Sequence, residues 1–143
     1  MELARPAEAG DREACTRLLE LAFHGARAMR GGPALLGEAT IDGLLERWGR
    51  PGAALFVGQY ETAVVGLLGV RLTGAVAGRV GALVECCYVE DGARGVGVGN
   101  TLMEAAVAWG RVQGCTEVDA LALPGDRALR PDRSRTVRLP WRS

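Results

Sequence analysis

One segment of the chain constrains the fold more than any other: an apolar strand that leads into a glycine-rich loop and then into a helix. The strand is predicted over 80–89, where both alternating faces are apolar except at Glu85. The loop follows at 92–99, the helix at about 98–113 and another strand at 116–121. This order is typical of a βαβ unit, in which the two strands lie parallel and close together. Strand 80–89 is therefore predicted to lie in the middle of a sheet that is covered on both faces.

The first half of the chain supplies the other predicted elements. A short strand is predicted at 2–5, and Asp11 is predicted to cap the helix that follows it. A second helix is predicted at 38–48, where apolar side chains recur at helical spacing. Two apolar runs at 53–60 and 63–72 predict a β-hairpin. A chain of 143 residues is long enough for one domain with a buried core.

The composition excludes several classes of function. All 17 basic residues are arginines, so mechanisms that need a lysine, such as a P-loop or a Schiff base, are excluded. The formal net charge is zero, and we predict no nucleic-acid partner and no membrane partner. No stretch is long and apolar enough to cross a membrane, and the N-terminus lacks a signal pattern. A cytoplasmic location is therefore expected.

The cysteines and the histidine do not form a metal-binding pattern. Cys15, Cys86, Cys87 and Cys115 contain no Cys-x-x-Cys pair, and His24 is the only histidine. A tetrahedral zinc site needs four such ligands at suitable spacing, so no metal is predicted. We interpret the four thiols as buried side chains in a reducing compartment.

The loop between the central strand and the helix has the properties of a phosphate-binding site. Gly95, Gly97 and Gly99 allow successive backbone N–H groups to point into one concavity at the start of a helix. Such a position attracts a phosphate or a pyrophosphate. Arg94 adds a positive charge there, and Thr101 adds a hydroxyl. The alternative is a glycine-rich turn that serves only the tight packing of the helix against the strand.

The pattern Arg94-x-x-Gly97-x-Gly99 resembles the signature of the GNAT (Gcn5-related N-acetyltransferase) superfamily, where it follows a long central strand. The segment 85–91 resembles the family's fourth strand, and the order of elements is similar over residues 1–127. The resemblance implies an α/β (α+β) fold with a mixed, mostly antiparallel sheet flanked by helices. It also implies an enzyme of the EC 2.3.1 type. Such an enzyme transfers an acetyl group from acetyl-coenzyme A (acetyl-CoA) to a primary amine of a small molecule or peptide.

The resemblance further implies which residues hold the cosubstrate. The pyrophosphate of coenzyme A would lie on the loop, within reach of Arg94, Gly95, Val96, Gly97, Val98, Gly99, Asn100 and Thr101. The pantetheine arm would pair like an extra strand with the end of the central strand, at Cys87, Tyr88 and Val89. The backbone N–H of Val89 would donate to the oxyanion of the reaction.

Glu85 is the predicted catalytic base. It is the only charged residue inside an otherwise apolar strand, and a buried carboxylate can accept a proton from the amine directly or through water. The alternative is a structural ion pair with an arginine on the neighbouring strand, such as Arg71 or Arg79. The sequence leaves both interpretations open.

The last twenty residues differ in character from the rest of the chain. Residues 124–143 carry six arginines and three prolines without helical or alternating periodicity. They predict a weakly structured tail after a domain at 1–123, with a short extended piece at 136–139. The family usually continues with a helix that carries a tyrosine acid and with further strands, but the only tyrosines here, Tyr60 and Tyr88, lie upstream. The final helix and strands are therefore predicted to be degraded, a break typical of a shifted reading frame or a truncated gene.

Two consequences follow from such a degraded end. The strand at 116–121 would have an unpaired edge, which predicts a homodimer that covers it. Three functions also stay open: an active acetyltransferase, a coenzyme A-binding domain that has lost catalysis and acts as a sensor or interaction module, and a remnant that binds nothing.

Overall fold

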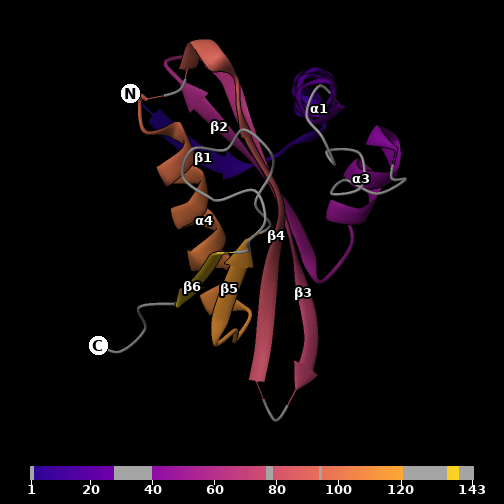
Figure 1. Cartoon of the computed structure of the whole chain (residues 1–143), viewed down its shortest axis with the longest axis vertical. Coiled ribbons are helices and arrows are strands. Elements are labelled where there is room, and N and C mark those ends of the chain that lie inside the picture. The colour runs from indigo at the N-terminus through magenta and orange to yellow at the C-terminus, as the bar shows by residue number, and fades with distance from the viewer. Residues whose placement is uncertain (1, 28–39, 77–78, 94, 121–134, 139–143) are drawn as a thin grey trace.

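A computed structural model describes residues 2–27, 40–76, 79–93, 95–120 and 135–138 of the chain. The described elements form one six-stranded sheet with helices on both faces (Figure 1). The strands are β1 (Glu2–Pro6), β2 (Ala53–Tyr60), β3 (Ala63–Val76), β4 (Arg79–Val89), β5 (Glu117–Ala120) and β6 (Arg135–Arg138). The helices are α1 (Arg12–Arg27), α3 (Ile41–Trp48) and α4 (Val98–Val112), with short 3-10 helices η1 (Ala9–Asp11) and η2 (Asp91–Ala93).

The strands lie in the sheet in the order in which they occur in the sequence. Neighbouring strands are antiparallel except for β4 and β5, which are parallel and are joined through α4. Figure 1 shows α4 on one face of the sheet and α1 and α3 on the other. The predicted βαβ unit and the predicted α/β (α+β) fold with a mixed, mostly antiparallel sheet are thus confirmed.

Apolar side chains form one core on each face of the sheet. The core on the α4 face joins that helix to the sheet through Leu68, Val70, Val84, Val98, Leu102, Ala106 and Val118. The core on the α1 and α3 face contains Leu18, Leu19, Leu45, Trp48, Val57, Leu67 and Cys86. Strand β4 contributes to both cores, which confirms that it is a central strand covered on both faces.

The chain enters α1 in a different way from the one predicted. Asp11 is the last residue of η1 rather than the cap of α1, and its carboxylate accepts a hydrogen bond from the backbone N–H of Glu8 at 2.7 Å. The same carboxylate forms a two-pronged ion pair with Arg5 of β1, at 2.7 and 3.0 Å. The capping prediction was wrong because an acidic residue three positions into a helical turn satisfies N–H groups as well as one at the cap does.

Helix α3 begins at Ile41, and the side chain of Thr40 caps it by accepting a hydrogen bond from the N–H of Gly43 at 3.0 Å. The first two residues of the predicted helix, 38 and 39, lie outside the described residues. At the other end, the ring of Trp48 lies on Gly69 of β3, where a Cβ would approach the ring to 2.1 Å. Helix and sheet can meet this closely only because Gly69 has no side chain.

The predicted alternation of side chains along the central strand holds for only part of it. Gly69 of β3 pairs with Cys86 of β4, but the next residue, Val70, pairs with Val84, so Glu85 is the extra residue of a β-bulge. As a result Val84 belongs to the core under α4, whereas Cys86 belongs to the core under α1 and α3. Strict alternation would have placed these two side chains on the same face.

The fifth strand does not have the unpaired edge that was predicted for it. Strand β6 pairs antiparallel with β5, from Glu117 opposite Arg138 to Ala120 opposite Arg135. The predicted extended piece is therefore a strand that begins at Arg135. It extends the sheet through backbone hydrogen bonds, which do not depend on the type of side chain. The homodimer stays a prediction, but an unpaired edge on β5 no longer supports it. The predicted domain boundary at residue 123 lies outside the described residues.

Candidate functional site

The loop between β4 and α4 contains two glycines in the left-handed conformation. Gly95 has φ 89° and Gly97 has φ 88°, values that side chains disfavour, and Gly97 is the residue from which α4 starts. The first bond of the helix runs from the N–H of Thr101 to the carbonyl of Gly97 at 3.0 Å. The N–H groups of Val98, Gly99 and Asn100 precede that bond, and α4 has no acidic residue in its first turn. This end of the helix therefore offers backbone donors and a positive dipole to an anion.

Other predicted loop residues are placed as follows. Val96 and Gly99 are partly buried, and Asn100 is exposed at the start of α4. Arg94 lies outside the described residues. The hydroxyl of Thr101 donates to the carbonyl of Gly97 at 2.9 Å, so this side chain closes the first turn of α4.

Two glycines of the sheet fix how closely α4 approaches. A Cβ on Gly58 of β2 would lie 2.5 Å from Cγ1 of Val98, and one on Gly66 of β3 would lie 3.2 Å from Cδ1 of Leu102. The first turns of α4 thus rest in a shallow notch made by the absence of two side chains. Sequence reasoning missed this notch because a glycine inside a strand does not indicate what packs on it.

A carboxylate lies beside the loop. A Cβ on Gly97 would be 3.4 Å from Oε1 of Glu2, the first residue of β1. A negative charge in this position interacts favourably with the positive end of the α4 dipole. Its position could not be foreseen from the sequence, since it depends on how β1 and α4 pack across the sheet.

The ladder between β4 and β5 ends next to the bulge. It joins Gly81–Val84 of β4 to Glu117–Ala120 of β5, and β4 then continues to Val89 in register with β3. The bulge also directs the side chains beyond it. Cys87 and Val89 pack with the core under α4, whereas Tyr88 packs with the core under α1 and α3. The methyl group Cγ2 of Val89 lies 3.8 Å from where a Cβ of Gly99 would be, so this end of β4 meets the loop.

Glu85 projects toward α3 and is surrounded by donors. Its Oε1 accepts a hydrogen bond from the indole N–H of Trp48 at 3.0 Å, and its Oε2 accepts one from Arg47 at 2.9 Å. Oε2 also forms an ion pair with Nε of Arg71 at 3.1 Å. The predicted ion pair with Arg71 is therefore present, and the side chain of Arg79 lies outside the described side chains. The two residues from α3 were not predicted as partners, because that contact depends on the packing of the helix.

Burial favours the protonated thiol form of the buried cysteines over the nucleophilic thiolate form. Burial raises the pKa of Cys86 to about 12 and that of Cys15 to about 11, and it also raises the pKa of Cys115. These three side chains are buried, as predicted, but Cys87 is only partly buried, so the prediction of four buried thiols is wrong for this residue. Within the described ranges, no three His, Cys, Asp or Glu residues come together as metal ligands would.

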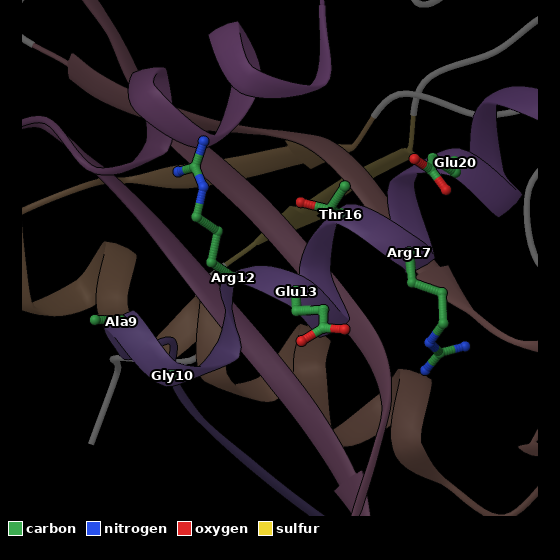
Figure 2. Close-up of a pocket in the computed structure, with 7 residues that line it drawn as sticks. All are labelled: Ala9, Gly10, Arg12, Glu13, Thr16, Arg17 and Glu20. Atoms are coloured by element: carbon green, nitrogen blue, oxygen red, sulfur yellow. The ribbon is translucent and has the colours of Figure 1, made fainter.

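Two hollows on the described surface are lined neither by the loop nor by Glu85. A hollow of about 680 Å³ follows the first turns of α1 (Figure 2), and one of about 430 Å³ lies between η1, α3 and β2. Figure 2 shows Arg12 and Arg17 leaving α1 in opposite directions, with Glu13 between them. Arg17 pairs with Glu90 at 2.7 Å, which ties α1 to the segment that leads from β4 into the loop.

The glycine loop thus follows β4 and leads into α4, close to where the β4–β5 ladder ends. The model of the acetyltransferase (GNAT) family matches residues 12–130. The chain belongs to the GNAT acetyltransferase family. The family resemblance inferred from Arg94, Gly97 and Gly99 is thereby confirmed, and enzymes of this family use acetyl-CoA to acetylate an amine. A search of curated proteins finds no match.

Solved structures share the fold of this GNAT chain. A transcriptional regulator from Bacillus halodurans is 22% identical with a TM-score of 0.68, over 90% of this chain and 85% of that one. An acetyltransferase from Vibrio fischeri is 15% identical with a TM-score of 0.68, over 82% and 93%. AAC(6')-Iy, in complex with the bisubstrate analogue CoA-S-monomethyl-acetylneamine, is 18% identical with a TM-score of 0.68, over 90% and 84%. None of the helices in the described residues is long and apolar enough to cross a membrane.

Proposed function

We propose that this protein binds acetyl-CoA at the loop before α4 and transfers the acetyl group to a primary amine of a small molecule or peptide. The observation that carries the proposal is the start of α4, where a left-handed Gly97 precedes three N–H groups with no acidic residue in the first turn. In a chain of the GNAT family, this position suits the pyrophosphate of coenzyme A. The fold neighbour AAC(6')-Iy carries a coenzyme A-derived ligand, which supports the same choice of cosubstrate.

The proposed roles follow the chain from the loop back into β4. Arg94 and the loop from Gly95 to Thr101 hold the pyrophosphate, mainly through backbone N–H groups. Cys87, Tyr88 and Val89 lie at the end of β4 that meets the loop, and we assign them to the pantetheine arm. The N–H of Val89 would stabilise the oxyanion, and no metal takes part.

Glu85 is the proposed proton acceptor for the amine, acting through water. It is the one carboxylate of β4, and its side chain is 12% exposed. Catalysis by this group requires that the water reach a carboxylate already bound by two arginines and a tryptophan. The second candidate function rests on these bonds: a coenzyme A-binding domain in which Glu85 is structural and which serves as a sensor or an interaction module.

A cytoplasmic location and the absence of nucleic-acid and membrane partners also stay proposals. The absence of such partners rests on the zero formal net charge. A homodimer is also proposed, because β1 and β6 are the two edge strands of the described sheet and a second copy could pair with one of them. Light scattering at micromolar concentration tests it, and a monodisperse monomer would contradict it.

Calorimetry with acetyl-CoA tests the loop. Gly97→Asp should weaken binding by roughly 10–100-fold, because a carboxylate beside a pyrophosphate costs about 1–3 kcal/mol. Gly114→Asp is the matched control, since Gly114 has φ 83° at the other end of α4. It carries the same strain and charge far from the loop. If both variants bound acetyl-CoA with equal affinity, the loop could not be part of the binding site.

A thiol-release assay with a panel of amines separates the two candidate functions. Turnover that is lost in Glu85→Gln while acetyl-CoA still binds supports the acetyltransferase with Glu85 as base. Binding without turnover on any amine supports the domain that has lost catalysis.

A further inference from the structure

Two arginines share one carboxylate oxygen at the point where β4 leaves β5. Arg47 of α3 and Arg71 of β3 both contact Oε2 of Glu85, at 2.9 and 3.1 Å. The other oxygen of Glu85 is occupied by the indole of Trp48. Counting formal charges, this cluster carries two positive groups and one negative group, which leaves a net charge of +1.

The positive charge lies at the surface and the negative charge below it. The side chain of Glu85 is 12% exposed, whereas those of Arg47 and Arg71 are 46% and 41% exposed. A molecule that approaches this cluster therefore meets two guanidinium groups before it meets the carboxylate. The carboxylate holds both arginines in place and reduces the entropy that they would lose on binding a ligand.

Both guanidinium groups have donors to spare. Arg71 uses Nε for Glu85, which leaves its Nη1 and Nη2 edge, and Arg47 uses Nη1, which leaves Nε and Nη2. Within the described chain, neither arginine forms another hydrogen bond or ion pair. The two-pronged edge of a guanidinium matches the two oxygens of a carboxylate.

Nearby charged residues do not neutralise the net positive charge of this cluster. Glu46 of α3 is paired with Arg50, just beyond the end of that helix, and Asp42 of α3 is paired with Arg12 of α1, so these four charges cancel in pairs. Asp119 of β5 faces the same side as Arg71, because both residues are in register with Leu83. It lies two strands away, about 10 Å at the usual strand spacing, and takes part in an interaction of its own.

We propose that Arg47 and Arg71 form an anion subsite that selects acceptors carrying a carboxylate in addition to the amine, such as free amino acids. This inference rests on the proposed function, since it assigns the acceptor of the same site. The two arginines bind the carboxylate of the acceptor, and the amine then points toward the acetyl group held along the end of β4. A polycationic acceptor would meet a site of its own sign and is disfavoured.

Steady-state kinetics with matched acceptors test the subsite. Each amino acid is compared with its carboxamide, and the comparison uses the ratio of variant to wild type for each acceptor, so differences in amine basicity cancel. Arg71→Gln and Arg47→Gln should raise KM for the amino acid roughly tenfold or more, and leave KM for the carboxamide and for acetyl-CoA within about twofold. Arg71→Lys should restore part of the loss, since it keeps the charge without the two-pronged edge.

Arg50→Gln is the matched control, because it removes the same charge just beyond the end of α3 and leaves Glu85 untouched. Equal losses for amino acid and carboxamide would overturn the proposal and make the arginines supports for Glu85. A weaker affinity for acetyl-CoA in the Arg71 and Arg47 variants would also overturn it, by assigning the arginines to the cosubstrate.

A binding experiment separates this proposal from the proposed function. Calorimetry with N-acetyl amino acids, the products of the reaction, needs no turnover. Binding that is lost in Arg71→Gln supports the subsite even if no amine is acetylated, while absent binding to the wild-type protein contradicts it. Failure of acetyl-CoA itself to bind would instead contradict the proposed function.

Discussion

Replacing Gly58 by alanine should move the start of α4 and with it the loop. The new Cβ would lie 2.5 Å from Cγ1 of Val98, about 1–1.5 Å inside the usual carbon–carbon contact of about 3.5–4.0 Å. Val98 cannot rotate away cheaply, because a β-branched side chain in a helix has one strongly preferred rotamer. The helix must therefore shift by about 1 Å, at a typical cost of about 1–3 kcal/mol of folding free energy.

The functional effect should exceed the effect on stability. The shifted residue is the first of α4, so the N–H groups of Val98 and Gly99 move with it. A misplacement of about 1 Å at a binding or catalytic group can cost up to about 100-fold. We expect Gly58→Ala to weaken acetyl-CoA binding in calorimetry by at least tenfold, under conditions where chemical denaturation shows the protein still folded.

A second substitution and a control make this test strict. Gly58→Ala combined with Val98→Ala removes the methyl group that clashes and should restore most of the affinity. Gly74→Ala in β3 adds the same group where nothing lies within 4 Å, and should change neither property. The reasoning is refuted if Gly58→Ala binds acetyl-CoA like the wild type, or if the double variant binds no better than the single one.

Two further predictions concern stability and thiol chemistry. The pKa of Asp11 is lowered, first by its hydrogen bond with Arg5, so the folding free energy that it contributes is present above its ordinary value of 3.8 and is lost as pH falls through the lowered value. Asp11→Asn should therefore unfold more readily than the wild type at pH 6 in urea titrations, with a difference that disappears at acid pH; a constant difference would exclude the linkage. Cys86 and Cys15, with pKa values raised to about 12 and 11, should resist iodoacetamide at pH 7.5 until urea unfolds the chain, and rapid labelling of the folded protein would contradict their burial.

The elements that sequence periodicity predicted are those whose patterns are local. The hairpin of β2 and β3, the central strand and α4 each bury a continuous run of apolar side chains, so spacing alone indicates them. Strand β6 was predicted only as a short extended piece, because its residues are mostly arginines and threonine and its formation depends on pairing with β5. Pairing between strands far apart in sequence leaves little local signal.

The sequence predicted the loop of the candidate site, but not which residues of other elements pack around it. Closely spaced glycines at the start of a helix indicate an anion site, since both the left-handed conformation and the N–H groups of the first helical turn are local properties. The notch of Gly58 and Gly66 and the carboxylate of Glu2 beside Gly97 arise where separate elements pack together. No spacing in the sequence relates these residues to the loop.

The bulge at Glu85 explains how one strand serves both sides of the site. Before it, Val84 faces α4; after it, the alternation is reversed, so that Cys86 and Tyr88 face α3 while Val89 packs under α4 next to the loop. If side chains alternated strictly from Val84 onward with no bulge, Val89 would face α3 and could not touch the start of α4. Glu85, which is itself the extra residue, points at Trp48 and at the two arginines. The bulge therefore lets the end of β4 meet the proposed cosubstrate loop while Glu85, one residue after Val84, points to the opposite face, where we place the acceptor.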